Sequence, residues 1–174
     1  MAAGGERGRD PGPTDPDQGI WRGRRVARRH VSPDGLVVLV GRSAEDNDIL
    51  SLKLAAPRDF WLHVASGPGS HVVVRNPDGL RRLPRDTARF AAGLAAAHSS
   101  ARDGGRVAVH LAFAAEVSKP RGLPAGKVQI GRWESVTASP LHLPAEGEGT
   151  GPGAPGAGQA AVPSSGVRSP RRRS

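Results

Sequence analysis

The sequence predicts a single α+β domain, with an antiparallel or mixed sheet of about seven short strands and two main helices. Short apolar or alternating segments recur between residues 20 and 141, separated by tight turns rich in Gly, Pro, Asp and Asn. Two longer segments, 44–54 and 84–102, carry apolar residues at helical spacing. No internal repeat and no heptad pattern is present. Together these observations favour the α+β class.

Both ends of the chain are expected to be disordered. Residues 1–19 contain almost no apolar side chains, and residues 142–174 are rich in Gly, Pro, Ala and Ser and end in a cluster of arginines. Such segments bury too little apolar surface to offset the entropy lost on ordering. We therefore expect a disordered arm over 1–19, a folded domain over 20–141 and a disordered, basic-ended tail over 142–174.

The positive charge lies in the predicted domain rather than in the ends. Residues 20–141 hold 19 Lys and Arg against 10 Asp and Glu, a net charge of +9. Clustered positive charge raises both the affinity and the encounter rate for polyanions. Biased composition with arginines that only aid solubility is the alternative, but the charge favours a nucleic-acid partner.

The chain has no cysteine, which excludes disulfides and Cys-ligated zinc. Its start lacks the apolar core of a signal peptide, and the longest run of bulky apolar residues, Leu36–Val40, is far too short to span a bilayer. We expect a soluble, cytoplasmic protein with no membrane partner.

The predicted domain begins with a basic β-hairpin. Segment 24–31 carries arginines outward, the turn 32–35 contains Pro and Gly, and segment 36–40 is typical of a buried strand. Ser43 is a predicted N-cap for a helix from about Ala44 to Leu54. The acidic and amide residues at 46–48 are interpreted as part of this helix start, with Arg42 pairing with Asp46 or Asp48, although Arg42 could instead face phosphate.

The centre of the domain carries two strands with histidines. Alternation along 59–64 places Phe60, Leu62 and Val64 on an inner face, and it places Asp59, Trp61 and His63 on the other. The strand around 71–75 repeats this pattern after a Gly67-Pro68-Gly69 turn. If the strands pair, one polar surface is shared by Trp61, His63, His71 and Arg75.

A second helix and several short strands complete the prediction. The helix runs from Pro84 to Arg102 and ends at Gly104-Gly105. Short strands follow, separated by the turns 119–122 and 123–126. They are expected at Val107–Phe113, Val117, Lys127–Ile130 and Glu134–Ala138.

The order of motifs resembles one known family, the NFACT-R (NFACT RNA-binding) domain, the C-terminal domain of the NFACT ribosome quality control proteins of the RqcH and NEMF group. The likeness covers nearly the whole predicted domain. It rests on segments 40–48, 52–55, the Asp59-Phe60-Trp61-Leu62-His63 motif, Pro68-Gly69-Ser70-His71-Val72, Ala97-His98-Ser99, Val117-Ser118-Lys119-Pro120-Arg121-Gly122 and Gly126-Lys127-Val128.

The resemblance implies an RNA-binding module that contacts tRNA or the large ribosomal subunit, with other translation rescue factors as further partners. The sequence lacks the N-terminal NFACT domain, the helix-hairpin-helix segment and the coiled coil of that family. The resemblance therefore implies the RNA-binding part of these proteins and not the part that adds tails to stalled nascent chains. Phe60 within the Asp-x-Trp-x-His motif is a small departure at a position expected to face inward.

The candidate RNA contacts are basic or aromatic. The arginines of segment 22–29 are the best phosphate ligands, and the basic loop 119–122 with Lys127 either grips a phosphate or is a solvated turn. Trp61 is either a packed ring or a platform for a base, where stacking contributes ~1–3 kcal/mol. The candidates are Arg24, Arg25, Arg28, Arg42, Trp61, His63, His71, Arg75, Lys119, Arg121 and Lys127.

Two other functions stay open beside this non-enzymatic RNA-binding module. Asp59, His63 and His71 could hold a divalent ion and make the protein a small metal-dependent hydrolase acting on nucleic acid. The favoured interpretation of these residues is structural, with the histidines bonded to neighbouring groups and no cofactor bound. The other alternative is an adaptor protein that docks on the ribosome through the same basic face.

Overall fold

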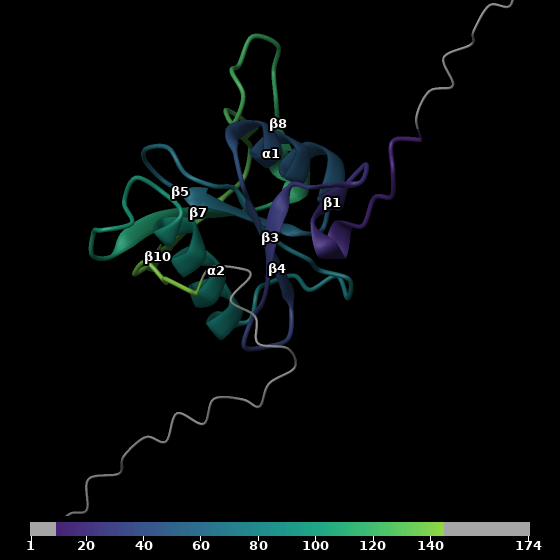
Figure 1. The fold of residues 1–174 in the computed structure, drawn as a ribbon. Helices are drawn as coiled ribbons and strands as arrows, with labels where there is room; N and C mark the ends of the chain where they lie inside the picture. The colour runs from purple at the N-terminus through teal and green to yellow at the C-terminus, as the bar shows by residue number, and fades with distance from the viewer. Residues whose placement is uncertain (1–9, 145–174) are drawn as a thin grey trace, which may run out of the picture. The chain divides into compact units, whose positions relative to one another are not determined.

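The computed structural model describes residues 10–144, and a six-stranded antiparallel sheet lies at its centre (Figure 1). The strands lie in the order β10-β7-β5-β6-β4-β3. They are β3 (Ala27–Val31), β4 (Val37–Gly41), β5 (Phe60–Val64), β6 (Val72–Val74), β7 (Val107–Phe113) and β10 (Glu134–Ala138). The predicted α+β class is therefore confirmed.

Two small ribbons and two short 3-10 turns flank this sheet. One ribbon pairs β1 (Ile20–Trp21) with β2 (Arg24–Arg25), and the other pairs β8 (Val117–Ser118) with β9 (Gln129–Ile130). The 3-10 turns are η1 (Pro16–Gln18) and η3 (Ala114–Glu116). The β8–β9 ribbon corresponds to the strands predicted at Val117 and Lys127–Ile130. The described part of the chain has more strands than the predicted seven because β1 was not predicted and the predicted strand 24–31 is divided into β2 and β3.

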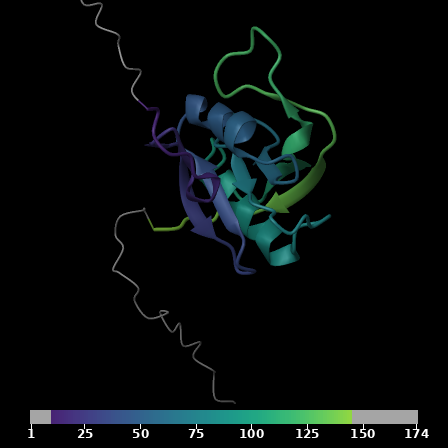
Figure 2. The ribbon, with the colours of Figure 1, turned by 90° about the vertical axis from the view of Figure 1, so that its right-hand side faces the viewer.

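The helices cover opposite faces of the sheet (Figures 1 and 2). On one face lies α2 (Arg85–Ala97), over the inward row Phe60, Leu62 and Val64 that alternation predicted. On the other face, α1 (Ala44–Ile49) continues into the π-helical turn η2 (Leu50–Leu54). The sheet is therefore buried from both sides along its centre.

The local signals for α1 behave as predicted. Ser43 lies in extended backbone, and its Oγ accepts the Asp46 N–H at 3.1 Å. The helical conformation ends at Leu54, and Pro57 follows three residues later. The predicted N-cap and the predicted extent of this helix are both confirmed.

Helix α2 ends at Ala97, five residues earlier than predicted. The Ser99 hydroxyl donates to the Ala96 carbonyl at 2.7 Å, and the backbone of residues 98–100 pairs with residues 68–70. A Cβ on Gly69 would lie 2.8 Å from the Ser99 Cβ, so this close approach requires glycine. Hydrogen bonds to a distant loop, rather than the glycine pair at 104–105, end the helix.

Residues 10–19 belong to the folded structure, which corrects the expectation of a disordered arm over 1–19. The Asp15 carboxylate caps η1, and Gly19 is buried, with its carbonyl accepting the Val26 N–H at 2.9 Å. Polar and backbone contacts hold this segment, so its lack of apolar residues was misleading. Predictions for residues 1–9 and 145–174 lie outside the described residues. Within 10–144, no helix is long and apolar enough to cross a membrane.

Candidate nucleic-acid interface

The two histidine-bearing strands pair as predicted, but α1 and η2 cover the face that carries Trp61. Strands β5 and β6 are antiparallel, with Trp61 opposite Val73. The Trp61 ring lies 5.1 Å from that of His71, and the His63 ring lies 5.4 Å from His71. Trp61 is only 2% exposed and packs in a cluster with Leu50 and Leu54. The structure therefore favours the packing alternative for Trp61 and corrects its place among the RNA contacts.

A chain of hydrogen bonds runs through the buried His71 side chain. Trp61 Nε1 donates to Ser51 Oγ at 2.9 Å, Ser51 Oγ lies 2.7 Å from His71 Nδ1, and His71 Nε2 lies 3.2 Å from the Gly126 carbonyl. A carbonyl can only accept, so Nε2 carries the proton and Nδ1 accepts from the serine hydroxyl. His71 thus holds the 124–127 loop from inside and, at 1% exposure, is a positioning residue rather than an RNA contact.

Burial keeps this histidine neutral. Burial first, and then the charge of His63, lower the pKa of His71 to about 4, against the opposing effects of Asp48 and of hydrogen bonds with Gly126 and Asn47. The pKa of His63 is also lowered, first by burial and then by the charges of His110 and Lys127, against two backbone hydrogen bonds. At neutral pH these rings therefore act as hydrogen-bonding groups, and the positive charge nearby comes from Arg and Lys.

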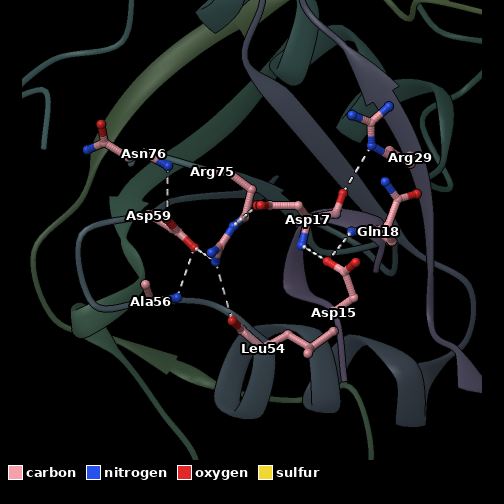
Figure 3. A network of polar contacts seen from close by, with 9 residues as sticks. All are labelled: Asp15, Asp17, Gln18, Arg29, Leu54, Ala56, Asp59, Arg75 and Asn76. Carbon is pink, nitrogen blue, oxygen red and sulfur yellow. Dashed lines mark hydrogen bonds and ion pairs between the residues drawn. The ribbon is translucent and has the colours of Figure 1, made fainter. Parts of the chain in front are cut away.

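Arg75 is held between two carboxylates, as Figure 3 shows. Its guanidinium lies 2.5 Å from Asp59 Oδ2 and 2.9 Å from Asp17 Oδ1. The Asp59 carboxylate also accepts the backbone N–H groups of Ala56 at 2.8 Å and Asn76 at 2.9 Å. Arg75 ties the N-terminal segment to the sheet, and its predicted phosphate contact stays a prediction.

The same contacts bear on the hydrolase alternative. Both oxygens of Asp59 are engaged by Arg75 and by two N–H groups, while His63 and His71 contact each other. No group of three or more His, Asp or Glu side chains suited to a metal ion occurs among residues 10–144. The three proposed ligands are thus not brought together as a metal site.

Lys119 and Asp48 hold the basic loop in a closed form. Lys119 Nζ lies 2.9 Å from Asp48 Oδ2 and donates to the carbonyls of Pro124 and Lys127 at 2.7 and 2.9 Å. The Gly126 N–H donates to Asp48 Oδ1 at 3.2 Å. Lys119 therefore holds the loop in place, and its predicted phosphate contact stays a prediction, while Arg121 and Lys127 are exposed.

Three segments enclose a pocket of about 320 Å³ beside this loop. They are the start of α1, the 67–70 loop and residues 125–127, with His63 and His98 completing the wall. The Asn47 side chain fixes two of these segments, because it accepts the His71 N–H at 3.0 Å and donates to the Gly69 carbonyl at 3.3 Å. The pocket joins His63 and Lys127, both predicted, with His98, whose approach depends on the early end of α2.

Two arginines lie next to the start of α1, which forms one wall of this pocket. Arg24 pairs with Asp46 in the first turn of α1 at 2.6 Å yet keeps 57% of its side chain exposed, and Arg42 directly precedes the Ser43 cap and is exposed. The expected pairing of Arg42 with Asp46 or Asp48 is wrong, since Arg24 and Lys119 take those carboxylates. Arg25 is also exposed, with one N–H donated to the Gln18 carbonyl.

Arg28 lies on the opposite face of the sheet from α1, near the pocket residue His98. It is opposite Val40 in the β3–β4 register, so it points to the α2 face, where His98 ends the helix. Burial lowers the pKa of His98, and the charges of Arg28, His30 and His142 lower it further. The pocket therefore has neutral imidazoles within it and cations around it, an arrangement suited to a phosphate-bearing ligand.

A family profile described as NFACT protein RNA binding domain matches residues 27–132. The chain is 36% identical over 117 residues to the Rqc2 homolog RqcH of Bacillus subtilis (strain 168), covering 66% of this chain and 20% of that protein. It is 34% identical over 121 residues to the Rqc2 homolog RqcH of Streptococcus suis (strain 05ZYH33), covering 68% and 21%. The chain thus spans about a fifth of the length of these relatives.

Two further matches extend the comparison. The Drosophila melanogaster ribosome quality control complex subunit NEMF homolog is 29% identical over 73 residues, which cover 42% of this chain and 7% of that protein. A solved structure of the C-terminal part of the fibronectin/fibrinogen-binding protein from Streptococcus suis superposes with a TM-score of 0.62 at 32% identity. That match covers 68% of this chain and 47% of the solved one.

Proposed function

Since the chain belongs to the NFACT RNA-binding domain family, we propose that it is a non-enzymatic RNA-binding module of ribosome-associated quality control, working in the cytoplasm on tRNA or on RNA of the large ribosomal subunit. The observation that carries the proposal is the pocket between the start of α1 and the 67–70 and 125–127 loops. Its cations and neutral histidines suit the phosphates and polar groups of RNA.

The charge distribution supports the same function. The segment matched by the family holds much of the excess of Lys and Arg over Asp and Glu, and Arg24, Arg42 and Lys127 are exposed around the pocket. Phosphate contacts of this kind supply most of the affinity for RNA and make that affinity depend on salt. Catalysis is not needed for this role, and Asp59, the carboxylate that a hydrolase would use, is occupied by Arg75.

The experiment compares two double variants of equal charge. Arg42→Gln with Lys127→Gln removes two cations beside the pocket, whereas Arg89→Gln with Arg106→Gln removes two exposed cations from a different cavity, beside α2 and the end of β10. Binding of tRNA and of ribosomal RNA fragments is measured over a range of salt concentrations.

The first variant should lower affinity and reduce the salt slope by about one unit, or slightly less, for each lost phosphate contact. The control should change the slope much less. Equal effects in the two variants would place the interface elsewhere on the domain. Absence of RNA binding by the unaltered protein would reject the function itself.

A further inference from the structure

Trp133 is the large aromatic side chain that the fold leaves most open, at 50% exposure, among those described. It follows Arg132 at the entry to β10 and stacks on His110 of β7, with ring centroids 3.9 Å apart and an angle of 30° between the planes. One face of the indole therefore has a fixed support, and half of the side chain meets solvent.

The turn that carries Trp133 is held in place by Glu116. The Arg132 N–H donates to Glu116 Oε2 at 2.9 Å, and the Gly131 N–H donates to the Glu116 carbonyl at 3.0 Å. The β7–β10 pairing fixes the residues that follow, from Glu134 onward. An aromatic ring held in this way loses little further conformational entropy when a planar ligand stacks on it.

Register places this ring on the same face as the basic pocket. His110 is opposite His63 in the antiparallel β5–β7 pair, so the two imidazoles point to one side of the sheet. His63 lines the pocket together with Lys127, and both His110 and Lys127 lie close enough to His63 to lower its pKa. From β5 to β10 is two strand spacings, about 10 Å.

We propose that Trp133, supported by His110, is a platform on which an unpaired RNA base stacks while the neighbouring pocket holds phosphate. This inference deepens the proposed function and rests on it. Every base has an aromatic face, so such a platform selects single-stranded over paired nucleotides without selecting a particular base. It assigns to Trp133 the stacking role for which the sequence had suggested Trp61.

The surroundings favour a nucleotide over an apolar peptide as the occupant. Three exposed arginines, Arg81, Arg82 and Arg132, line one cavity with the ring, together with the carboxylates of Glu116 and Glu134. The family match ends at residue 132, so Trp133 lies directly after the matched segment and its support His110 lies within it.

The test uses the full chain with two RNA probes of equal length, an unstructured oligouridylate and a blunt duplex, at one salt concentration. Trp133→Ala should weaken binding of the single strand by about fivefold to 150-fold and should leave duplex binding unchanged. Trp133→Phe keeps an aromatic face and should restore most of the loss. Melting temperatures of all three proteins should agree closely, since the side chain is half exposed.

Fluorescence gives a second readout. Single-stranded RNA should quench part of the tryptophan emission of the unaltered protein, and that part should be missing in Trp133→Ala, which retains Trp21 and Trp61. Equal single-strand affinity in the unaltered protein and Trp133→Ala would overturn the platform, and the proposed function would stand if Arg42→Gln with Lys127→Gln still weakened binding. If Trp133→Ala lost binding to a ribosomal protein but kept its RNA affinity, the RNA platform would be overturned in favour of a protein contact.

Discussion

The two faces of the central sheet are packed by different chemistry. Under α2, valines, leucines and alanines pack together with few polar groups. Gly93 lets the segment around Leu141 lie close against α2, since a Cβ on Gly93 would be 2.8 Å from the Leu141 Cβ. Under α1 and η2, apolar side chains are mixed with buried polar groups, among them Ser51, Asp59 and His71. The buried polar groups that reach the candidate interface therefore lie mainly on the α1 side, whereas the α2 side is packed mostly by apolar side chains.

The polar groups on the α1 side link the interior to the candidate interface. Ser51 and His71 reach the Gly126 carbonyl, Asp48 reaches the Gly126 N–H, and Asn47 reaches Gly69. Each of these contacts ends on a loop that encloses the pocket. Changes on the α1 side should therefore alter RNA binding, and equivalent changes on the α2 side should alter stability alone.

The largest expected effect is on the α2 side. Leu94 is fully buried in the cluster beneath α2, so Leu94→Ala should lower the free energy of unfolding by about 2–5 kcal/mol through lost burial and an unfilled cavity. Denaturant titration measures this change. RNA affinity, measured well below the melting temperature, should remain that of the unaltered protein, and a clear loss of affinity would mean that the two sides are not separate.

Acid should act mainly on the α1 side. The pKa of His71 is about 4 in the folded protein against 6.5 in the unfolded chain, and the pKa of His63 is lowered as well. Between pH 6.5 and 4 the unfolded chain therefore binds a proton at His71 that the native protein does not bind. The stability that depends on neutral His71 is complete above pH 6.5 and is lost as pH falls towards 4. His71 alone accounts for roughly 3 kcal/mol over this range.

His71→Gln isolates this contribution. The variant should be less stable than the unaltered protein at pH 7, and its stability should fall less steeply between pH 6.5 and 4. Chemical denaturation at several pH values measures both slopes. Parallel slopes would show that carboxylates, and not this histidine, govern acid unfolding.

A smaller effect separates stability from binding. Ser51→Ala leaves the Trp61 N–H and His71 Nδ1 without their shared partner, which should cost about 1–3 kcal/mol and weaken RNA binding by loosening the 124–127 loop. Ser32→Ala is the matched control on the α2 side, because Ser32 is also buried, contacts Thr87 at 2.7 Å and accepts the Leu36 N–H. It should lose stability but retain RNA affinity. Equal RNA affinity in Ser51→Ala and Ser32→Ala would show that the hydrogen-bond chain through Ser51 does not support the interface.

The smallest expected effect is that of metal removal. Asp59 already satisfies Arg75 and two backbone N–H groups, so a chelator should change neither the melting temperature nor RNA affinity. Elemental analysis of the purified protein accompanies the measurement. One tightly held zinc or manganese ion per chain, together with RNA cleavage that stops on chelation, would instead support the hydrolase.

The sequence alone determined the features that depend on near neighbours. Alternation separated the Phe60 and Leu62 row from the Trp61 row, Ser43 indicated the start of α1, and the positions of β5, β7 and β10 followed from short apolar runs between turns. These signals are local, since side-chain direction in a strand and a cap at a helix start depend on a few adjacent residues. The order of motifs also indicated the family, which the profile match confirmed.

Only the tertiary structure decided which of these side chains remain available. Trp61 and Trp133 are the same residue type on the same side of the sheet, yet α1 and η2 bury one while the other lies beyond that cover. Likewise, the sequence does not indicate that Arg75 pairs with Asp59 or that Lys119 pairs with Asp48, because the partners are distant in sequence. Exposure and charge pairing depend on which segments pack together over long sequence separations, and local patterns carry no record of that packing.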